Sequence, residues 1–156
     1  MNKTEELQQL AQKSLYLGLD GDPIYAEHFS RLNKEIQILS DALYSVKGDT
    51  PEEEAGICLA LLMGYNATIY SDKDKEAKKQ SILDRAWEVL EQLPPSLLKC
   101  QLLTYCYGEV FEDELAQEAH AIIDSWQGRE LTFKEQEVVE NLRNLEENQY
   151  PYSDFE

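Results

Sequence analysis

The residues between Leu102 and Trp126, LLTYCYGEVFEDELAQEAHAIIDSW, concentrate side chains that could do chemistry. His120 lies four residues before Asp124, a spacing that brings two side chains to one face of a helix. A histidine held by a carboxylate could act as a general base. Because the sequence places no nucleophile near this pair, we interpret it as a structural contact.

Metal and phosphate chemistry have little support in the sequence. It contains neither the Glu-x-x-His motif of di-iron carboxylate bundles nor the H-E-x-x-H motif of zinc enzymes. Residues 72–77, DKDKEA, begin like a calcium loop, but Ala77 occupies the glycine position and Leu83 the position of the bidentate glutamate. A glycine-rich phosphate loop and a G-x-S-x-G elbow are also missing. We therefore predict a protein that is not an enzyme, with no catalytic residue, cofactor or metal.

The cysteines and the apolar runs indicate a cytoplasmic chain. Cys58, Cys100 and Cys106 are an odd number and show no C-x-x-C spacing, which favours buried, reduced thiols over disulfides. The longest apolar run, residues 55–63, is far shorter than the roughly 20 residues of a membrane span. The first ten residues, MNKTEELQQL, do not resemble a signal peptide.

The net charge of −17 indicates which partners the protein can bind. Phosphate backbones repel such a chain, so we expect no direct binding of nucleic acid. A basic protein partner is favoured, because opposite fields steer encounter. Residues 108–156 hold 3 basic and 14 acidic residues, a net charge of −11, whereas residues 1–107 hold 11 basic and 17 acidic residues, a net charge of −6.

The last third of the chain therefore contains the candidate partner-binding residues. A solvated acidic face is the simpler interpretation of these carboxylates, and a docking surface for a basic partner is the functional one. The tail, residues 148–156, adds aromatic residues that could act as anchors, although it could also fold back onto the domain or be disordered. The candidates are Glu109, Glu112, Asp113, Glu114, Glu135, Glu137, Glu140, Tyr150 and Tyr152.

Apolar periodicity and capping residues predict an all-α fold. Leucine, glutamate and alanine far outnumber valine, with 22, 21 and 11 residues against 5, which favours helix over sheet. We expect caps at Thr4, Asp22, Thr50, Ser96 and Thr132, and a C-terminal cap at Gly108. Trp87 is expected to point inward with Ala86 and Leu90. The predicted helices cover about residues 4–17, 23–47, 51–70, 75–93, 96–107, 112–126 and 132–145.

These helices predict a single domain, residues 1–147, of about seven helices packed as antiparallel pairs. A bundle and a tetratricopeptide-like stack both fit this description. The stripe from Tyr25 to Val46 is expected to face the core, and it is also compatible with a coiled-coil dimer seam. The nearly all-apolar segment GICLALLMGYNATIY predicts a central third helix.

Several long stretches resemble the UpxZ family of bacterial capsule-locus regulators. The resemblance extends from about Leu15 to Tyr152. It rests on LYLGLDGDPIYAEHF, TPEEEAGICLALLMGYNATIY, SILDRAWEVLEQLPPSLLK, LLTYCYGEVFEDELAQEAHAIIDSW and LEENQYPY.

This resemblance implies a protein encoded in a capsular polysaccharide locus beside a NusG-like antitermination factor, UpxY. A UpxZ protein acts in trans and inhibits the UpxY-type factors of other loci. No catalytic or binding residue can be carried over from the family. Two alternatives stay open: an acidic nucleic-acid mimic that binds RNA polymerase directly, and a helical small-molecule-binding domain around His120 and Asp124.

Overall fold

The structure, a computed structural model, describes residues 2–15, 26–67 and 74–147. These residues form seven α-helices and contain no strand, which confirms the all-α prediction. The chain divides into two compact units, residues 1–89 and 90–156. None of the described helices is long and apolar enough to cross a membrane.

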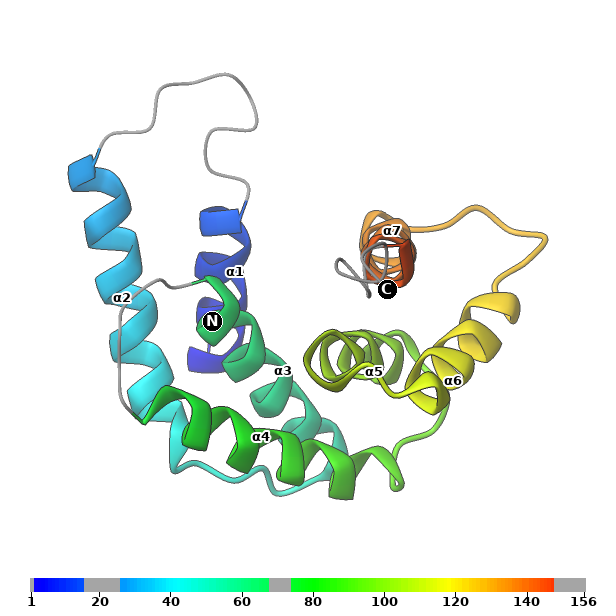
Figure 1. Ribbon diagram of the computed structural model, residues 1–156, viewed down its shortest axis with the longest axis horizontal. Helices are drawn as coiled ribbons and strands as arrows, with labels where there is room; N and C mark the ends of the chain where they lie inside the picture. The colour runs from blue at the N-terminus through cyan, green and yellow to red at the C-terminus, as the bar shows by residue number, and fades with distance from the viewer. Residues whose placement is uncertain (1, 16–25, 68–73, 148–156) are drawn as a thin grey trace, which may run out of the picture. The chain divides into compact units, whose positions relative to one another are not determined.

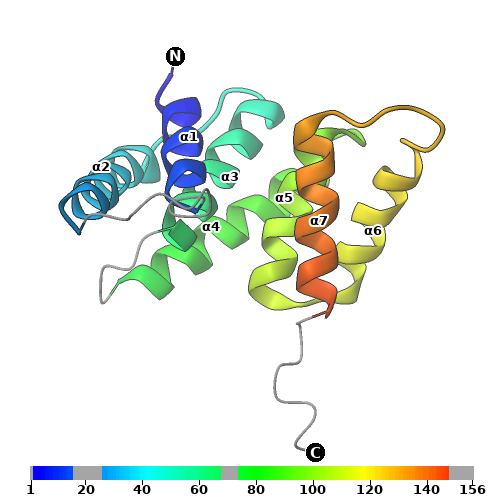
Figure 2. The same ribbon diagram turned by 90° about the horizontal axis from the view of Figure 1, so that it is seen from above.

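Three helices of the first unit pack around one another. They are α1 (Lys3–Leu15), α2 (Ala26–Tyr44) and α3 (Pro51–Ala67). α1 packs against both α2 and α3, and α2 also packs against α3 (Figures 1 and 2). α3 is buried along most of its length, as its apolar sequence predicts.

The three helices meet at Gly64. A Cβ atom at this position would lie 2.8 Å from Ser40 Oγ on α2 and 3.2 Å from Leu7 Cδ1 on α1. Only a glycine leaves room for so close an approach of two neighbouring helices. The predicted stripe on α2 lies in this core, where Ile36 and Leu43 are buried. Its face is therefore covered within the chain, and its last member, Val46, lies beyond the end of the helix.

The fourth helix, α4 (Lys75–Leu90), is tied to the other helices of the first unit through Arg85. The guanidinium donates to both carboxylate oxygens of Glu54, at 2.8 and 2.7 Å. It also donates to the carbonyl oxygens of Tyr44 and Val46, at 3.2 and 2.7 Å. One side chain thus joins the end of α2 and the start of α3 to α4. This ion pair holds the pKa of Glu54 below its usual value.

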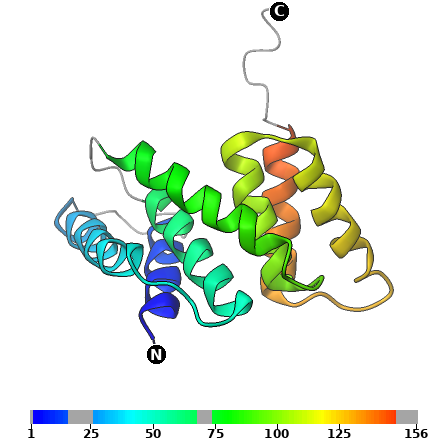
Figure 3. The ribbon, with the colours of Figure 1, turned by 90° about the horizontal axis from the view of Figure 1, so that it is seen from below.

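The second unit is a set of three helices, α5 (Leu97–Val110), α6 (Asp113–Asp124) and α7 (Phe133–Glu147). α5 packs against both of its partners (Figure 3). Gly108, near the end of α5, lies against Leu145, near the end of α7, so these two helices run in the same direction. α6 is the return segment between them.

The capping residues confirm three of the predicted helix starts. The hydroxyl groups of Thr50, Ser96 and Thr132 accept the backbone N–H groups of Glu53, Lys99 and Glu135. The predicted N-cap of the first helix, Thr4, is wrong, and the N-cap is Asn2. The Asn2 side chain accepts the N–H of Glu5 at 2.8 Å, and α1 begins at Lys3. Thr4 lies inside the helix, where its methyl group faces Gly56 of α3.

Two other local predictions are wrong. Gly108 lies inside α5, and the C-terminal cap is Phe111 in the left-handed region, with φ 53°. Trp87 is 37% exposed, whereas Ala86 and Leu90 are buried as predicted. The predicted cap at Asp22 and the tail lie outside the described residues.

Candidate protein-binding surface

The acidic residues between α5 and α6 form an exposed corner. Glu109 lies in the last turn of α5, and Glu112 is the N-cap residue of α6. The Glu112 side chain makes no capping hydrogen bond. Glu112, Asp113 and Glu114 are exposed, and Glu109 is half-buried. We call these four residues the acidic corner. Acidic side chains suit the start of a helix because its dipole attracts negative charge.

Phe111 ends α5 and keeps the connection between α5 and α6 short. Its backbone N–H donates to the Tyr107 carbonyl oxygen at 2.8 Å and so closes the end of α5. A bulky residue in the left-handed region is rare and costs free energy. The Phe111 ring packs edge-on against the Tyr107 ring, with centroids 5.2 Å apart, and this contact offsets part of that cost. α6 then begins only two residues after this cap.

Most basic residues of the second unit have carboxylate partners outside the acidic corner. Lys99 pairs with Glu118 at 2.6 Å, Arg129 pairs with Glu135 at 2.6 Å, and Arg143 lies 3.6 Å from Glu140. Three of the four basic residues between positions 90 and 147 therefore contact carboxylates outside the acidic corner.

Glu135 does not belong to this exposed surface. Its side chain is buried and accepts two hydrogen bonds from Arg129, at 2.9 and 2.6 Å. It also accepts the backbone N–H of Thr132 at 2.8 Å, which completes a reciprocal capping box. The ion pair and these bonds lower the pKa of Glu135 to about 2. The carboxylate has a structural role at the start of α7, so its place among the partner-binding candidates is corrected.

The other candidates on α7 differ in exposure. Glu140 is exposed and Glu137 is half-buried. Burial, and secondarily the charge of Glu137, raise the pKa of Tyr105 on α5 to about 12. Glu137 thus lies near the contact between α5 and α7. Tyr150 and Tyr152 lie outside the described residues.

His120 pairs with a residue on another helix. Its Nε2 atom lies 2.7 Å from Glu146 Oε1 on α7, and both side chains are partly exposed. The contact ties α6 to α7 at the surface. Metal-binding clusters of histidine, cysteine, aspartate or glutamate do not occur in the described parts of the chain.

All three cysteines are buried, as predicted. Burial raises the pKa values of Cys58 and Cys100 to about 12. A thiol with so high a pKa is a poor nucleophile at neutral pH. These cysteines pack in the core and are not suited to catalysis.

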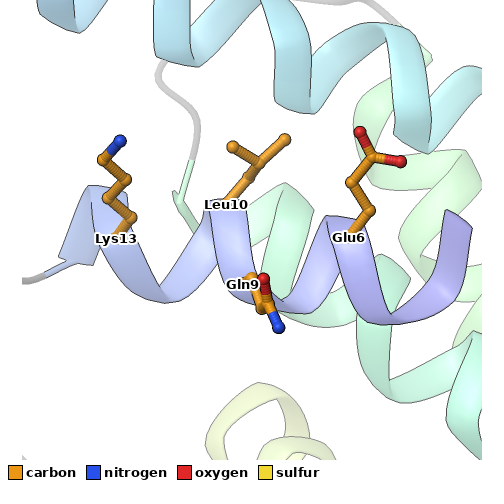
Figure 4. A pocket seen from close by; sticks show the side chains of 4 residues that line it. All are labelled: Glu6, Gln9, Leu10 and Lys13. Atoms are coloured by element: carbon orange, nitrogen blue, oxygen red, sulfur yellow. The ribbon is translucent and has the colours of Figure 1, made fainter. Parts of the chain in front are cut away.

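A shallow groove of about 440 Å³ lies along α1 and is lined by Glu6, Gln9, Leu10 and Lys13. Figure 4 shows Glu6, Leu10 and Lys13 on one side of the helix, with Gln9 turned away from them. The carboxylate of Glu6 and the ammonium group of Lys13 lie on either side of Leu10. They do not converge on a common point, as the groups of a catalytic site would. The groove gives no support to an enzymatic interpretation.

The described residues thus form an all-helical chain with an exposed acidic corner and three buried thiols. Residues 4–108 match the sequence profile of the UpxZ family of transcription anti-terminator antagonists. The chain is also similar to the crystal structure of the transcription anti-terminator antagonist UpxZ from Bacteroides uniformis ATCC 8492. The two are 51% identical, with a TM-score of 0.89 over 97% of this chain and 94% of the other. A search of the curated proteins found no match.

The chain belongs to the UpxZ family of transcription anti-terminator antagonists. This assignment confirms the resemblance seen in the sequence. The family is defined by a regulatory role in transcription, and its partners are of the antitermination kind.

Sequence reasoning missed one conspicuous surface residue. Phe133, the first residue of α7, is 71% exposed. Its exposure could have been predicted only from its position outside the apolar stripe on α7, which is formed by Val138, Leu142 and Leu145.

Proposed function

We propose that this protein inhibits NusG-like antitermination factors of the UpxY type, encoded by other capsular polysaccharide loci, by binding them through the acidic corner. The proposed action is protein–protein binding in the cytoplasm, without a catalytic step or a cofactor. The observation that supports it is the exposure of Glu112, Asp113 and Glu114 in a unit where three of the four basic residues contact other carboxylates.

Charge explains how such a partner would be captured. A factor that works beside nucleic acid and polymerase needs basic surface, and an acidic field steers such a surface toward the corner. Opposite fields accelerate association more than they add affinity. Inhibition follows if the inhibitor covers the surface with which the factor contacts polymerase or RNA.

The end of α7 extends the proposed surface. Leu145 lies against Gly108, so the chain leaves α7 close to the end of α5 and the acidic corner. Glu140, Glu137 and the tail residues Tyr150 and Tyr152 therefore stay in the proposal as secondary contacts. Helices α5, α6 and α7 of the second unit would supply the surface, and the tail, residues 148–156, a further anchor.

A matched pair of charge reversals tests the proposal. Asp113→Lys with Glu114→Lys changes the first turn of α6, and Glu5→Lys with Glu6→Lys changes the first turn of α1. All four side chains are exposed, and both variants change the net charge and the helix dipole in the same way. The assay is the association rate with a panel of purified UpxY-type factors, with general NusG as a control, at about 0.15 M and 1 M salt.

We expect the α6 variant to associate about tenfold more slowly at 0.15 M salt, because steering contributes about 10-fold or more to such rates. The difference should shrink at 1 M salt, where the Debye length falls to about 3 Å. The α1 variant should stay close to wild type. Equal slowing of both variants would show that net charge acts without a specific surface. Capture of RNA polymerase in the absence of any factor would favour the direct polymerase alternative.

A further inference from the structure

Two neighbouring apolar residues lie within the acidic corner. Val110, the last residue of α5, is 38% exposed, and Phe111, the C-cap residue, is half-buried. Glu109 precedes these two residues directly, and Glu112 follows them. We call Val110 and Phe111 the apolar pair. Single exposed apolar side chains are common on protein surfaces. The apolar pair differs from them because a carboxylate adjoins it on each side.

The backbone of Phe111 indicates that its side chain has a use. Among the described residues other than glycine, Phe111 alone has a positive φ, of 53°. Glycine and asparagine are the usual residues at such a helix end, because the left-handed region is unfavourable for a bulky residue. Strained backbone of this kind is found where a side chain is held for function. The helix end alone would be closed at least as well by glycine.

The adjoining carboxylates determine what can cover the apolar pair. A partner that buries Val110 also removes water from Glu109 and Glu112, and a desolvated carboxylate without a cation is costly. The covering surface therefore has to supply positive charges beside an apolar contact. A phosphate backbone or an anionic lipid surface would be repelled. A second copy of this chain would place one acidic corner against another, which like charges oppose.

We propose that the apolar pair binds a segment of the antitermination factor in which a large apolar side chain has lysine or arginine on both sides. The inference rests on the proposed function and names the chemistry that the acidic corner recognises. The cations of the segment pair with the carboxylates of the corner. Its apolar side chain packs against Val110 and the exposed part of Phe111. An apolar centre within a polar rim is the common arrangement of protein interfaces.

The two kinds of contact act on different steps of binding. Charges act over a distance, so they accelerate association and are screened by salt. An apolar contact forms only after the surfaces have met, so it slows dissociation and persists at high salt. A basic factor without the apolar side chain would therefore be attracted to the corner but not retained there. This difference in retention gives the corner a selectivity that bulk charge lacks.

Two substitutions remove the apolar contact without changing the net charge. Val110→Thr keeps the branched shape and nearly the same helix propensity, and it replaces one methyl group by a hydroxyl. Phe111→Gly removes the ring and suits the left-handed cap. The matched control is Val46→Thr in the first unit. Val46 is 41% exposed and lies just beyond the end of α2, but its neighbour Lys47 is basic.

The assay measures association and dissociation rates of each full-length variant with the same panel of purified UpxY-type factors, at about 0.15 M and 1 M salt. We expect Val110→Thr and Phe111→Gly to raise the dissociation rates of the factors that the wild type retains by about tenfold, at both salt concentrations. Their association rates and those of Val46→Thr should stay within about twofold of wild type. Asp113→Lys with Glu114→Lys should instead slow association, mainly at low salt.

Thermal melts separate binding from folding. All three variants should melt within about 4 °C of wild type, because the substituted side chains are partly exposed and glycine relieves the strain at position 111. If Phe111→Gly melts lower than this, the ring is structural, and Val110→Thr with its control decides the question alone.

Three results would overturn the inference, and they differ in what else they remove. Wild-type dissociation rates for Val110→Thr and Phe111→Gly, with the charge-reversed corner impaired, would remove the apolar contact and leave the proposed function intact. Weakening that disappears at 1 M salt would show that the substitutions act on the field of the corner and not on an apolar contact. Failure of the wild-type protein to bind any factor would remove both proposals.

Discussion

The hydroxyl group of Ser40 provides a quantitative test of how the first unit is packed. Ser40 is 1% exposed, and its Oγ has no hydrogen-bond partner among the described residues. Oγ also lies 2.8 Å from the position that a Cβ atom at Gly64 would occupy. Replacement of Ser40 by alanine therefore removes a buried, unsatisfied polar atom and makes room for a methyl group at position 64.

The expected magnitude follows from these two effects. An unsatisfied buried hydroxyl costs about 1–3 kcal/mol, and alanine is also the better helix former. Ser40→Ala should thus raise the free energy of unfolding by about 1 kcal/mol or more. Gly64→Ala gains about 1 kcal/mol of helix propensity, but the clash with Ser40 Oγ costs about 1–3 kcal/mol. Its net effect in the wild-type background should be a loss of about 1 kcal/mol.

The double variant should recover most of this loss. Without Oγ, the new methyl group at Gly64 meets Leu7 Cδ1 at 3.2 Å and Ile36 Cγ2 at 3.5 Å, and the first is the end of a flexible side chain. We expect a coupling free energy of about 1–2 kcal/mol between Ser40 and Gly64, of the size seen for residues in contact. Gly108→Ala is the matched control, because its Cβ would meet only side-chain atoms of Leu145, at 3.3 Å and beyond.

The assay is urea unfolding of the single and double variants, followed by far-ultraviolet circular dichroism. Fluorescence of single-tryptophan backgrounds, which keep either Trp87 in the first unit or Trp126 in the second, reports on each unit separately. The packing argument is refuted if Ser40→Ala destabilises the protein, or if the two changes add without coupling. Destabilisation by Gly108→Ala as large as that by Gly64→Ala would show that the clash with Ser40 is not the cause.

Three further predictions concern ion pairs. Arg85→Ala should lower the free energy of unfolding by about 3 kcal/mol, because it leaves Glu54 and two carbonyl groups without their shared donor. Arg143→Ala, which removes the partner of Glu140 in an exposed ion pair, should cost less than about 1 kcal/mol; urea unfolding compares the two variants. The folded pKa of Glu135 lies below its unfolded value, so this group stabilises the fold above about pH 4.5, and the stabilisation is lost as the pH falls toward 2. Glu135→Gln should therefore show a shallower fall in melting temperature over that window than wild type does, and parallel curves would contradict this sign. His120→Ala should leave capture of antitermination factors unchanged. If the variant no longer captured them, the alternative of a small-molecule-binding site around His120 and Asp124 would be supported.

Local sequence signals determined the correctly predicted parts of the fold. The caps at Thr50, Ser96 and Thr132 each depend on a residue and the backbone three positions later, so the sequence contains all that is needed. The central position of α3 follows likewise from its apolar composition. Family membership followed from long stretches between Leu15 and Tyr152, and the family profile matches residues 4–108.

The errors arose where distant residues decide the outcome. Gly108 has the residue type of a helix cap, but it packs against Leu145, 37 positions later, and α5 continues to its cap at Phe111. His120 has a carboxylate four residues away on its own helix, yet its partner is Glu146 on α7. The sequence allowed Glu135 either to complete a capping box or to belong to an exposed acidic face. Its pairing with Arg129 leaves it in the capping box alone. No single-sequence pattern contains these contacts.

The burial of the three thiols has a practical consequence for following motion in this protein. Cys58 lies in the first unit, and Cys100 and Cys106 lie in the second. A thiol that is buried and protonated is modified only when the surrounding structure opens, so its modification rate measures how often that opening occurs. The native chain therefore contains an internal reporter in each unit. A partner that binds the second unit should slow labelling of Cys100 and Cys106 while Cys58 continues to react at its own rate.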